Sequence, residues 1–227
     1  MNPHFLQSAA WQSFQEALGR KVYRQKGIDW EFMAILEPGT RLSPSRLYCP
    51  YGPTVSSIKG LKSALKALTE LATSLGVKFV RIEPLGVKFN AKDFRLKRVN
   101  YSQPAHTWQI DLNRSSDEII SQMKQNNRNI YRNYRKKGLS YRSSNNPNDC
   151  KYLIKLLHGV AAHNNITIHS DKYLQTQADV LLPINSAKLH FISLESKVIA
   201  AALTYEDEKT CYYAHAGASH EYRKLSA

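Results

Sequence analysis

Residues 58–84, IKGLKSALKALTELATSLGVKFVRIEP, predict a helix followed by a strand. Leucines recur at helical spacing and form one apolar stripe, made of Leu61, Leu65, Leu68, Leu71 and Leu75. Gly76 follows the stripe, at the position where a glycine commonly ends a helix. The β-branched and aromatic residues of 77–84 then predict a buried strand. This pair is typical of proteins that pack helices on a sheet.

The residues before this pair predict a helix and two strands. Residues 5–18 carry apolar side chains at helical spacing, and Gly19 ends that helix. Residues 30–36 and 46–49 predict strands, because they are apolar runs bounded by turn-forming residues. Residues 50–55, PYGPTV, predict a loop.

The second half of the chain repeats this order of helices and strands. Predicted strands lie at 107–112, 139–142, 188–195, 198–206 and 209–217, and predicted helices at 115–137, 149–163 and 171–182. Ser196 and Lys197 are expected to form the tight turn of a hairpin. The break between the halves lies near residues 100–106, so the sequence predicts an α+β protein with two related units, 1–105 and 106–227.

The second predicted unit lacks a closing strand. Its last predicted strand is followed by GASHEYRKLSA, residues 217–227, which predict the start of another helix. We therefore expect this unit to be incomplete at its C-terminus, with the sheet edge at 211–216 unpaired. A chain of this kind is expected to be inactive in catalysis and prone to aggregation.

Residues 115–142, SSDEIISQMKQNNRNIYRNYRKKGLSYR, predict a strongly basic helix about 20 residues long. Ser115 and Glu118 form a capping box at its start, and Gly138 follows its end. The cations that recur along one face and at the end are Lys124, Arg128, Arg132, Arg135, Lys136 and Lys137. Such a face indicates a phosphate-bearing partner, and a solvated helix face is the alternative.

Composition supports an anionic partner and sets further bounds. The formal net charge is +14 in 227 residues, which attracts nucleic acid, nucleotide-linked substrates or anionic lipid headgroups. The three cysteines, Cys49, Cys150 and Cys211, lie far apart without metal-ligand spacing, which indicates a reducing, cytosolic setting. The sequence shows no signal peptide and no run of apolar residues long enough to span a membrane. Contact with a membrane is therefore expected only at its cytosolic surface.

Conventional catalytic signatures are absent from the sequence. It contains no G-x-S-x-G, H-E-x-x-H, Walker A or G-x-G-x-x-G motif. His158, His163 and His169 lack a third or fourth zinc ligand at suitable spacing, so structural or surface roles are favoured. Gly217 and Ala218 follow a strand, but the run of glycines of an acyl-CoA pyrophosphate loop is missing.

Seven short motifs occur in an order that resembles the Fem family of non-ribosomal peptidyl transferases, aminoacyl-tRNA-dependent enzymes of peptidoglycan synthesis. The motifs are FLQSAAWQSF at 5–14, LYCPYGPTV at 47–55, FVRIEP at 79–84, QPAHTWQIDL at 103–112, RNIYRNYRKKGL at 128–139, HNNITIHS at 163–170 and CYYAHAGAS at 211–219. The resemblance covers nearly the whole chain. It implies two tandem GNAT-like domains, 1–105 and 106–227, with the second incomplete.

The resemblance also implies a reaction and its partners. The donor would be an aminoacyl-tRNA, and the acceptor an amine on the stem peptide of a UDP-linked or lipid-linked muropeptide precursor. The product would serve cell-wall cross-bridges and cell shape. Aminolysis of an ester requires positioning, proton removal and oxyanion stabilisation but no enzyme nucleophile, so the missing triad is expected. No cofactor and no metal are implied.

Site residues follow from the same resemblance. Catalytic positions would be Glu83, Tyr213 and His215, and substrate-binding positions Tyr48, Gly52 and His169. Glu83 would serve either as a general base or as a hydrogen-bonding strut. Gly52 would allow close backbone approach in a tight turn. The alternative for Tyr213 is an aromatic side chain of the core.

Two rival functions stay open at this point. An acyl-CoA-dependent GNAT enzyme would share the fold but should carry a diphosphate-binding loop. A non-catalytic RNA-binding module would use residues 124–142 to bind tRNA and would ignore a muropeptide.

Overall fold

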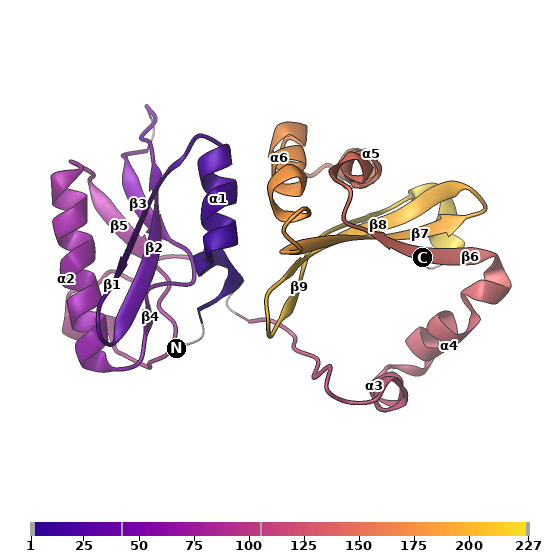
Figure 1. Cartoon of the computed structure of the whole chain (residues 1–227), viewed down its shortest axis with the longest axis horizontal. Helices are drawn as coiled ribbons and strands as arrows, with labels where there is room; N and C mark the ends of the chain where they lie inside the picture. The colour runs from indigo at the N-terminus through magenta and orange to yellow at the C-terminus, as the bar shows by residue number, and fades with distance from the viewer. Residues whose placement is uncertain (1–2, 42, 105, 226–227) are drawn as a thin grey trace. The chain divides into compact units, whose positions relative to one another are not determined.

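The computed structural model of the chain describes residues 3–41, 43–104 and 106–225. The chain divides into two compact units, residues 1–105 (unit 1) and 106–227 (unit 2). Each unit is a sheet with helices packed on it (Figure 1).

Unit 1 has a five-stranded sheet. Its strands are β1 (Lys21–Lys26), β2 (Trp30–Glu37), β3 (Arg46–Cys49), β4 (Thr54–Val55) and β5 (Phe79–Ile82). The order is β1-β2-β3-β5, with β4 paired to β2; β3 and β5 pair in parallel, and the pairs of β2 with β1, β3 and β4 are antiparallel. The sequence patterns did not predict β1, and β4 lies in the segment predicted as a loop.

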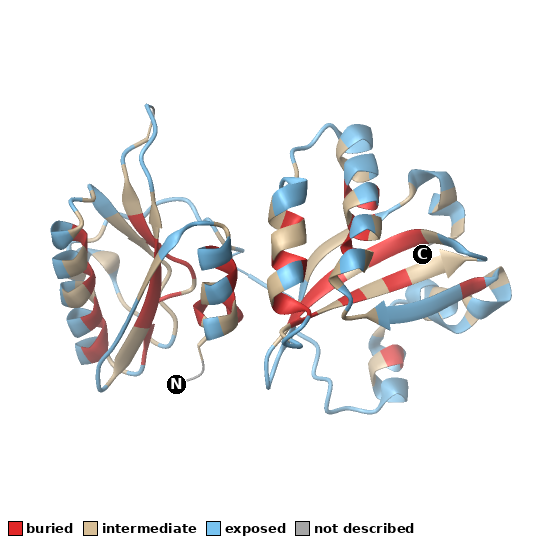
Figure 2. Cartoon of the chain, turned by 45° about the horizontal axis from the view of Figure 1, so that its top comes forward, coloured by how far each residue is buried: buried red, intermediate tan, exposed pale blue. Residues whose placement is uncertain are grey.

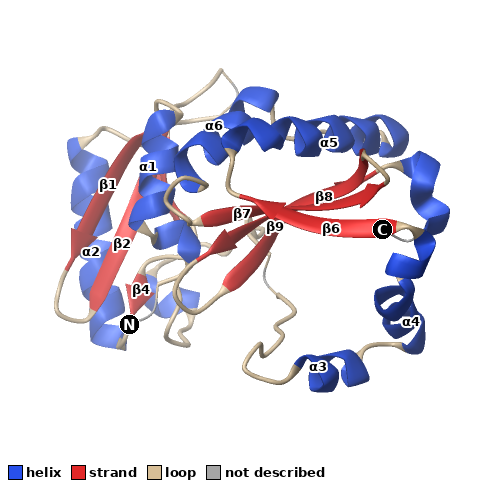
Figure 3. Ribbon diagram, turned by 45° about the vertical axis from the view of Figure 1, so that its right-hand side comes forward, coloured by secondary structure: helices blue, strands red, loops and turns tan. Residues whose placement is uncertain are grey.

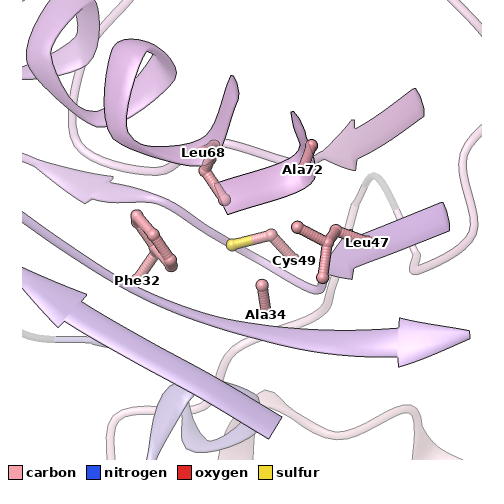
Figure 4. Close-up of a cluster of buried hydrophobic side chains, with 6 residues drawn as sticks. All are labelled: Phe32, Ala34, Leu47, Cys49, Leu68 and Ala72. Atoms are coloured by element: carbon pink, nitrogen blue, oxygen red, sulfur yellow. The ribbon is translucent and has the colours of Figure 1, made fainter. Parts of the chain in front are cut away.

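Helix α2 (Ile58–Ser74) makes the crossover that the parallel pair β3–β5 requires. Ser57 begins it, because the Ser57 hydroxyl accepts a hydrogen bond from the Gly60 N–H. Its buried stripe is narrower than predicted: Leu61 and Leu68 are fully buried, whereas three of the predicted leucines are only partly buried. Figure 4 shows Leu68 and neighbouring side chains of the core, the full set being Phe32, Ala34, Leu47, Cys49, Leu68 and Ala72.

The opposite face of this sheet is covered by η1 (Phe5–Gln7) and α1 (Ala9–Ala17), as Figure 1 shows. The predicted helix over 5–18 is split at Ser8, whose extended backbone caps α1 through a hydrogen bond from the Trp11 N–H to its hydroxyl. Phe5, Trp11 and Phe14 are buried beneath these helices.

A buried glutamine completes the sheet along the edge of β2 that faces away from β1, between the ends of β3 and β4. β3 pairs with β2 from Ile35 onward, and β4 pairs with β2 only up to Glu31. Between them, the Gln7 side chain accepts a hydrogen bond from the Met33 N–H at 2.7 Å and donates one to the Met33 carbonyl at 3.1 Å. The same amide nitrogen donates to the Pro50 carbonyl at 2.6 Å, so Gln7 also holds the loop that follows β3.

Unit 2 has a four-stranded antiparallel sheet in the order β6-β7-β8-β9. Its strands are β6 (Leu139–Ser144), β7 (Ala187–Leu194), β8 (Lys197–Glu206) and β9 (Cys211–Ala218). Its helical segments are α3 (Ser116–Gln122), α4 (Gln125–Asn133), η3 (Arg135–Lys137), η4 (Pro147–Asp149), α5 (Cys150–Asn164), α6 (Asp171–Leu181) and η5 (His220–Leu225). The β7–β8 turn falls at residues 195–196, one residue earlier than predicted.

Helices α5 and α6 pack on one face of this sheet (Figure 3). Gly217 lies against α5, and a Cβ atom there would come within 3.1 Å of the Leu156 carbonyl carbon and the Leu157 nitrogen. A side chain at this position would therefore push helix and strand apart. We call the side of the sheet under α5 and α6 the helix face, and the other side the open face. Figure 2 shows that buried residues gather along the central strands and the inner sides of the helices.

Two sequence predictions in unit 2 are wrong. Residues 107–112 form no strand, and Trp108, Ile110 and Leu112 are exposed, because no described strand pairs with this segment. The basic helix predicted over 115–137 is interrupted: its capping box is present, but Met123 and Lys124 have extended backbones between α3 and α4. The cations all follow this break: Lys124 begins α4, Arg128 and Arg132 lie on it, and Arg135–Lys137 form η3.

The strand β9 forms an edge of the unit 2 sheet, and a cysteine stands at its first position. β9 lies at one edge, and no described strand pairs with its outer side. It begins at Cys211, which is exposed, whereas Cys49 and Cys150 are buried.

Among the described residues, no helix combines the length and the apolarity needed to cross a bilayer.

We expect replacement of Gln7 by Leu to destabilise unit 1 by about 2–4 kcal/mol, because the Met33 N–H and two carbonyls would lose buried partners. Urea unfolding and hydrogen exchange at the Met33 amide measure this change. The matched control is Gln25→Leu, at an exposed position of β1, which we expect to change stability by less than about 0.5 kcal/mol. Equal stability of the two variants would contradict the prediction.

Candidate functional site

The candidate site residues form three groups, each contained in one unit. Glu83, Tyr48 and Gly52 lie together in unit 1. His169 and His215 meet in unit 2, and the basic residues lie on α4 and its flanks.

Glu83 follows β5, and its carboxylate is surrounded by hydrogen-bond donors. Oε2 accepts from the Tyr48 hydroxyl at 3.0 Å and the Tyr51 N–H at 3.3 Å. Oε1 accepts from the N–H groups of Ser102 and Gln103 at 3.1 and 3.2 Å. Because four donors occupy the two oxygens, the geometry favours the strut over the general base. Glu83 ties β3, the loop after it and the 102–103 segment together.

The Tyr48 hydroxyl forms two hydrogen bonds within unit 1. It donates to Glu83 and accepts from the Gln103 side-chain amide at 3.1 Å. Burial, together with the nearby Glu83 carboxylate, raises the pKa of Tyr48 well above its ordinary value. Tyr48 therefore stays protonated and positions Gln103 and Glu83.

Gly52 is buried in the loop after β3. A Cβ atom there would lie 2.7 Å from Cys49 Sγ and 2.8 Å from Gln7 Cδ. The close approach expected of Gly52 is thus an approach to the Gln7 amide. Tyr51 beside it presents its N–H to Glu83, and its ring packs against the His4 ring at a tilt, with centroids 4.1 Å apart.

His215 on β9 lies on the helix face, beside a buried polar pair. The Gln177 amide donates to the Tyr205 hydroxyl oxygen at 2.6 Å, and this oxygen lies 3.4 Å from Nε2 of His215. Gln177 and Tyr205 are buried. Since the Gln177 amide donates to the Tyr205 oxygen, the Tyr205 hydroxyl hydrogen can be donated to His215 Nε2. The ring proton of a neutral His215 then resides on Nδ1.

His169, in the loop between α5 and α6, lies next to this pair. Its ring meets the His215 ring edge-on, with centroids 5.6 Å apart, and stacks on Tyr173 at 4.1 Å. Burial, and secondly the nearby His169, lower the pKa of His215 to about 4. His215 is therefore a neutral imidazole at pH 7.

Tyr213 does not join this group. A β-bulge changes the register between β8 and β9, so His215 pairs with Leu203 while Tyr213 pairs with Thr204. Leu203 and Thr204 are adjacent and point to opposite faces, so His215 lies on the helix face and Tyr213 on the open face. Tyr213 is 76% exposed, which rules out the alternative of a core aromatic side chain.

The basic residues are engaged to different degrees. Arg128 donates to the Ser121 and Met123 carbonyls at 2.8 and 2.9 Å, which closes the end of α3. Arg135 contacts the Tyr134 hydroxyl and ring, and Lys137 donates to the Leu225 carbonyl. Lys124, Arg132 and Lys136 are exposed, and none of the six cations forms an ion pair with a described carboxylate.

The residues that orient the predicted site residues were not predicted from the sequence. Gln177 lies among Leu174, Ala178 and Leu181 on the inner side of α6, and a polar residue in an apolar stripe was the available signal. Tyr205 and Gln103 carried no comparable signal, because their partners are distant in the sequence. Within the described ranges, no three His, Cys, Asp or Glu side chains gather as a metal site would need.

Comparisons with known proteins place the fold. No protein-family model matches the chain, and no curated protein matches it. A solved structure of FemX matches with a TM-score of 0.78 and 15% identity over 99% of this chain and 78% of that one. At this identity the likeness shows the fold, so the chain has a FemX-like fold, and the predicted α+β, GNAT-like class is confirmed.

Two further solved structures match with a TM-score of 0.54. One is a conserved protein of unknown function from Bacteroides thetaiotaomicron, at 14% identity over 92% of this chain and 70% of that one. The other is the C-terminal domain of a protein described as a lysylphosphatidylglycerol synthetase from Agrobacterium fabrum, at 13% identity over 98% and 67%.

We expect the His215 ring to titrate near pH 4, and His169→Ala to raise that pKa because one neighbouring imidazole is removed. An unfolded histidine titrates near pH 6.5. The unfolded chain therefore binds the extra proton first, and the stability of unit 2 should fall as the pH drops from about 6.5 toward 4. NMR titration of the ring carbons measures the pKa directly.

The matched control is His163→Ala. The His163 ring contacts His220, with centroids 3.8 Å apart, rather than His215. This variant should leave the pKa of His215 unchanged. Titration of His215 near pH 6.5 in the unmodified chain would show that the buried arrangement is wrong.

Proposed function

We propose that this chain belongs to an aminoacyltransferase of the Fem type, which moves an amino acid from aminoacyl-tRNA to an amine of a peptidoglycan precursor. The observation that carries the proposal is the FemX-like fold over 99% of the chain. The seven sequence motifs support it, because they lie in the order that the resemblance to the Fem family requires.

The chemistry of the His215 group suits aminolysis of an ester. The donor ester is already activated, so the enzyme must position the amine and stabilise the oxygen that gains charge. A neutral His215 whose Nε2 faces Tyr205 offers its Nδ1–H as a hydrogen-bond donor. We assign His215 this donor role, with Tyr205 and Gln177 fixing its tautomer and His169 beside it.

The Glu83 group would serve the same reaction as a positioning element. Its carboxylate fixes the Tyr51 N–H and the 102–103 backbone at once. A glutamine there would have one oxygen to accept these bonds and an NH2 group facing N–H donors. A Glu83→Gln variant would therefore no longer hold the loop after β3 in position, although the substitution removes no reacting atom.

The cationic excess supports an anionic donor and acceptor. A net charge of +14 favours association with tRNA and with the phosphates of a UDP-linked or lipid-linked acceptor. Lys124, Arg132 and Lys136 are the exposed cations of the basic segment that no hydrogen bond or ion pair shown by the structure engages. Arg128 serves the turn between α3 and α4 instead. A reaction at the cytosolic face of the membrane follows if the acceptor is lipid-linked.

The decisive experiment supplies the native protein with a muropeptide precursor and either charged tRNA or acetyl-CoA. We expect an extended stem peptide with charged tRNA and none with acetyl-CoA. Replacement of His215 by Ala should lower kcat about 100-fold, in the range found for removal of one oxyanion donor. His163→Ala is the control and should keep full activity. Turnover with acetyl-CoA and none with charged tRNA would overturn the proposal.

Salt dependence of tRNA binding tests the basic segment separately. The double variant Arg132→Ala with Lys136→Ala should reduce the slope of log Kd against log salt by about 1.4–1.8, since each lost phosphate contact removes roughly 0.7–0.9. Lys59→Ala with Lys62→Ala on α2 removes the same charge from another surface and is the control. Equal slopes for both double variants would indicate that the basic segment is a solvated surface and does not contact tRNA phosphates.

A further inference from the structure

Helix α4 has a composition that packing within the chain does not explain. Apart from Ile130 and Tyr131 it consists of Gln, Asn and Arg, and none of its nine side chains is buried. Figure 3 shows it away from the layer of α5 and α6 that covers the sheet. A helix that is polar on all sides buries no apolar face, so its stability has to come from other contacts.

The charge around α4 indicates the kind of partner that could supply those contacts. Residues 119–141 carry six Lys or Arg and no Asp or Glu. Arg132 and Lys136 are exposed, and no hydrogen bond or ion pair shown by the structure engages them. Since no carboxylate of the segment neutralises these cations, an anionic partner lowers their mutual repulsion.

An exposed aromatic ring stands among these cations. Tyr131 precedes Arg132 on α4 and is 52% exposed. Its ring meets the Tyr134 ring at a tilt, with centroids 6.5 Å apart, and the Arg135 guanidinium lies 5.6 Å from the centre of the Tyr134 ring. A ring flanked by cations is typical of sites for unpaired nucleotides, because a base stacks on the ring while the phosphates beside it meet the cations.

We propose that α4 and η3 bind an unpaired segment of RNA, with one base stacked on Tyr131 and the neighbouring phosphates on Arg132 and Lys136. This inference rests on the proposed function and narrows it, because the RNA is then the donor tRNA and the contact is to its unpaired nucleotides. A duplex fits less well, since its bases stack on each other and leave no free face for Tyr131. A membrane surface also fits less well, since α4 lacks the apolar face that interfacial helices bury.

Three RNA probes of one length test the proposal: a single strand, the same strand with abasic sites, and its duplex. All three carry phosphates, but only the first offers free base faces. Tyr131→Ala, which keeps a good helix former in α4, should weaken binding of the single strand about 5-fold to 150-fold, the loss of one stacked base. Binding of the other two probes should not change. The slope of log Kd against log salt should also stay the same, because the ring contacts no phosphate.

An unchanged affinity of Tyr131→Ala for the single strand, or an equal loss for all three probes, overturns the proposal. Tyr131→Phe keeps the ring and should bind like the native protein. Tyr101→Ala removes a tyrosine of similar exposure beside Arg98 in unit 1 and should have no effect. Nuclear Overhauser contacts from the Tyr131 ring to another segment of the RNA-free protein would show a covered ring and overturn the proposal. Binding to anionic vesicles that depends on Tyr131, with RNA binding that does not, would assign α4 to a membrane and overturn it as well.

Transfer assays separate this inference from the proposed function. With charged tRNA and a muropeptide precursor, Tyr131→Ala should raise KM for the tRNA and leave kcat unchanged, because the ring is remote from the reacting ester in its role. An unchanged KM would overturn the inference alone. RNA binding that depends on Tyr131, without any turnover of charged tRNA, would overturn the proposed function and leave α4 an RNA-binding surface.

Discussion

The sheet of unit 1 depends on one buried amide. Gln7 replaces a missing strand beside β2, because it satisfies both backbone groups of Met33 between the ends of β3 and β4. Its third bond, to Pro50, holds the loop whose next residue presents an N–H to Glu83. The absent side chain of Gly52 leaves space for this amide. A residue near the N-terminus therefore fixes the candidate site more than 40 positions later in the chain.

Local patterns explain which features could be predicted. The stripe of leucines before Gly76 depends on neighbours three and four residues apart, so it predicts α2 without knowledge of the sheet. The capping box at Ser115 is equally local and is present. The alternation of 107–112 is just as regular, but a strand exists only where another strand pairs with it. Periodicity alone could not supply that partner.

The arrangement of the predicted site residues could not be derived from the sequence, because it depends on strand pairing. Tyr213 and His215 are two positions apart, which places both on one face of a regular strand. The bulge opposite Leu203 and Thr204 separates them, and it depends on pairing with β8 rather than on β9 itself. Likewise, the role of Arg128 comes from two carbonyls of the preceding helix, which charge spacing could not reveal.

The exposure of one cysteine has a practical consequence for spectroscopy. Cys49 and Cys150 are buried, and burial raises the pKa of both thiols, so little reactive thiolate forms at either. Cys211 stands exposed at the first position of the edge strand β9. A maleimide fluorophore or nitroxide should therefore attach at a single position without any mutation. The label would report on the strand that carries both Tyr213 and His215.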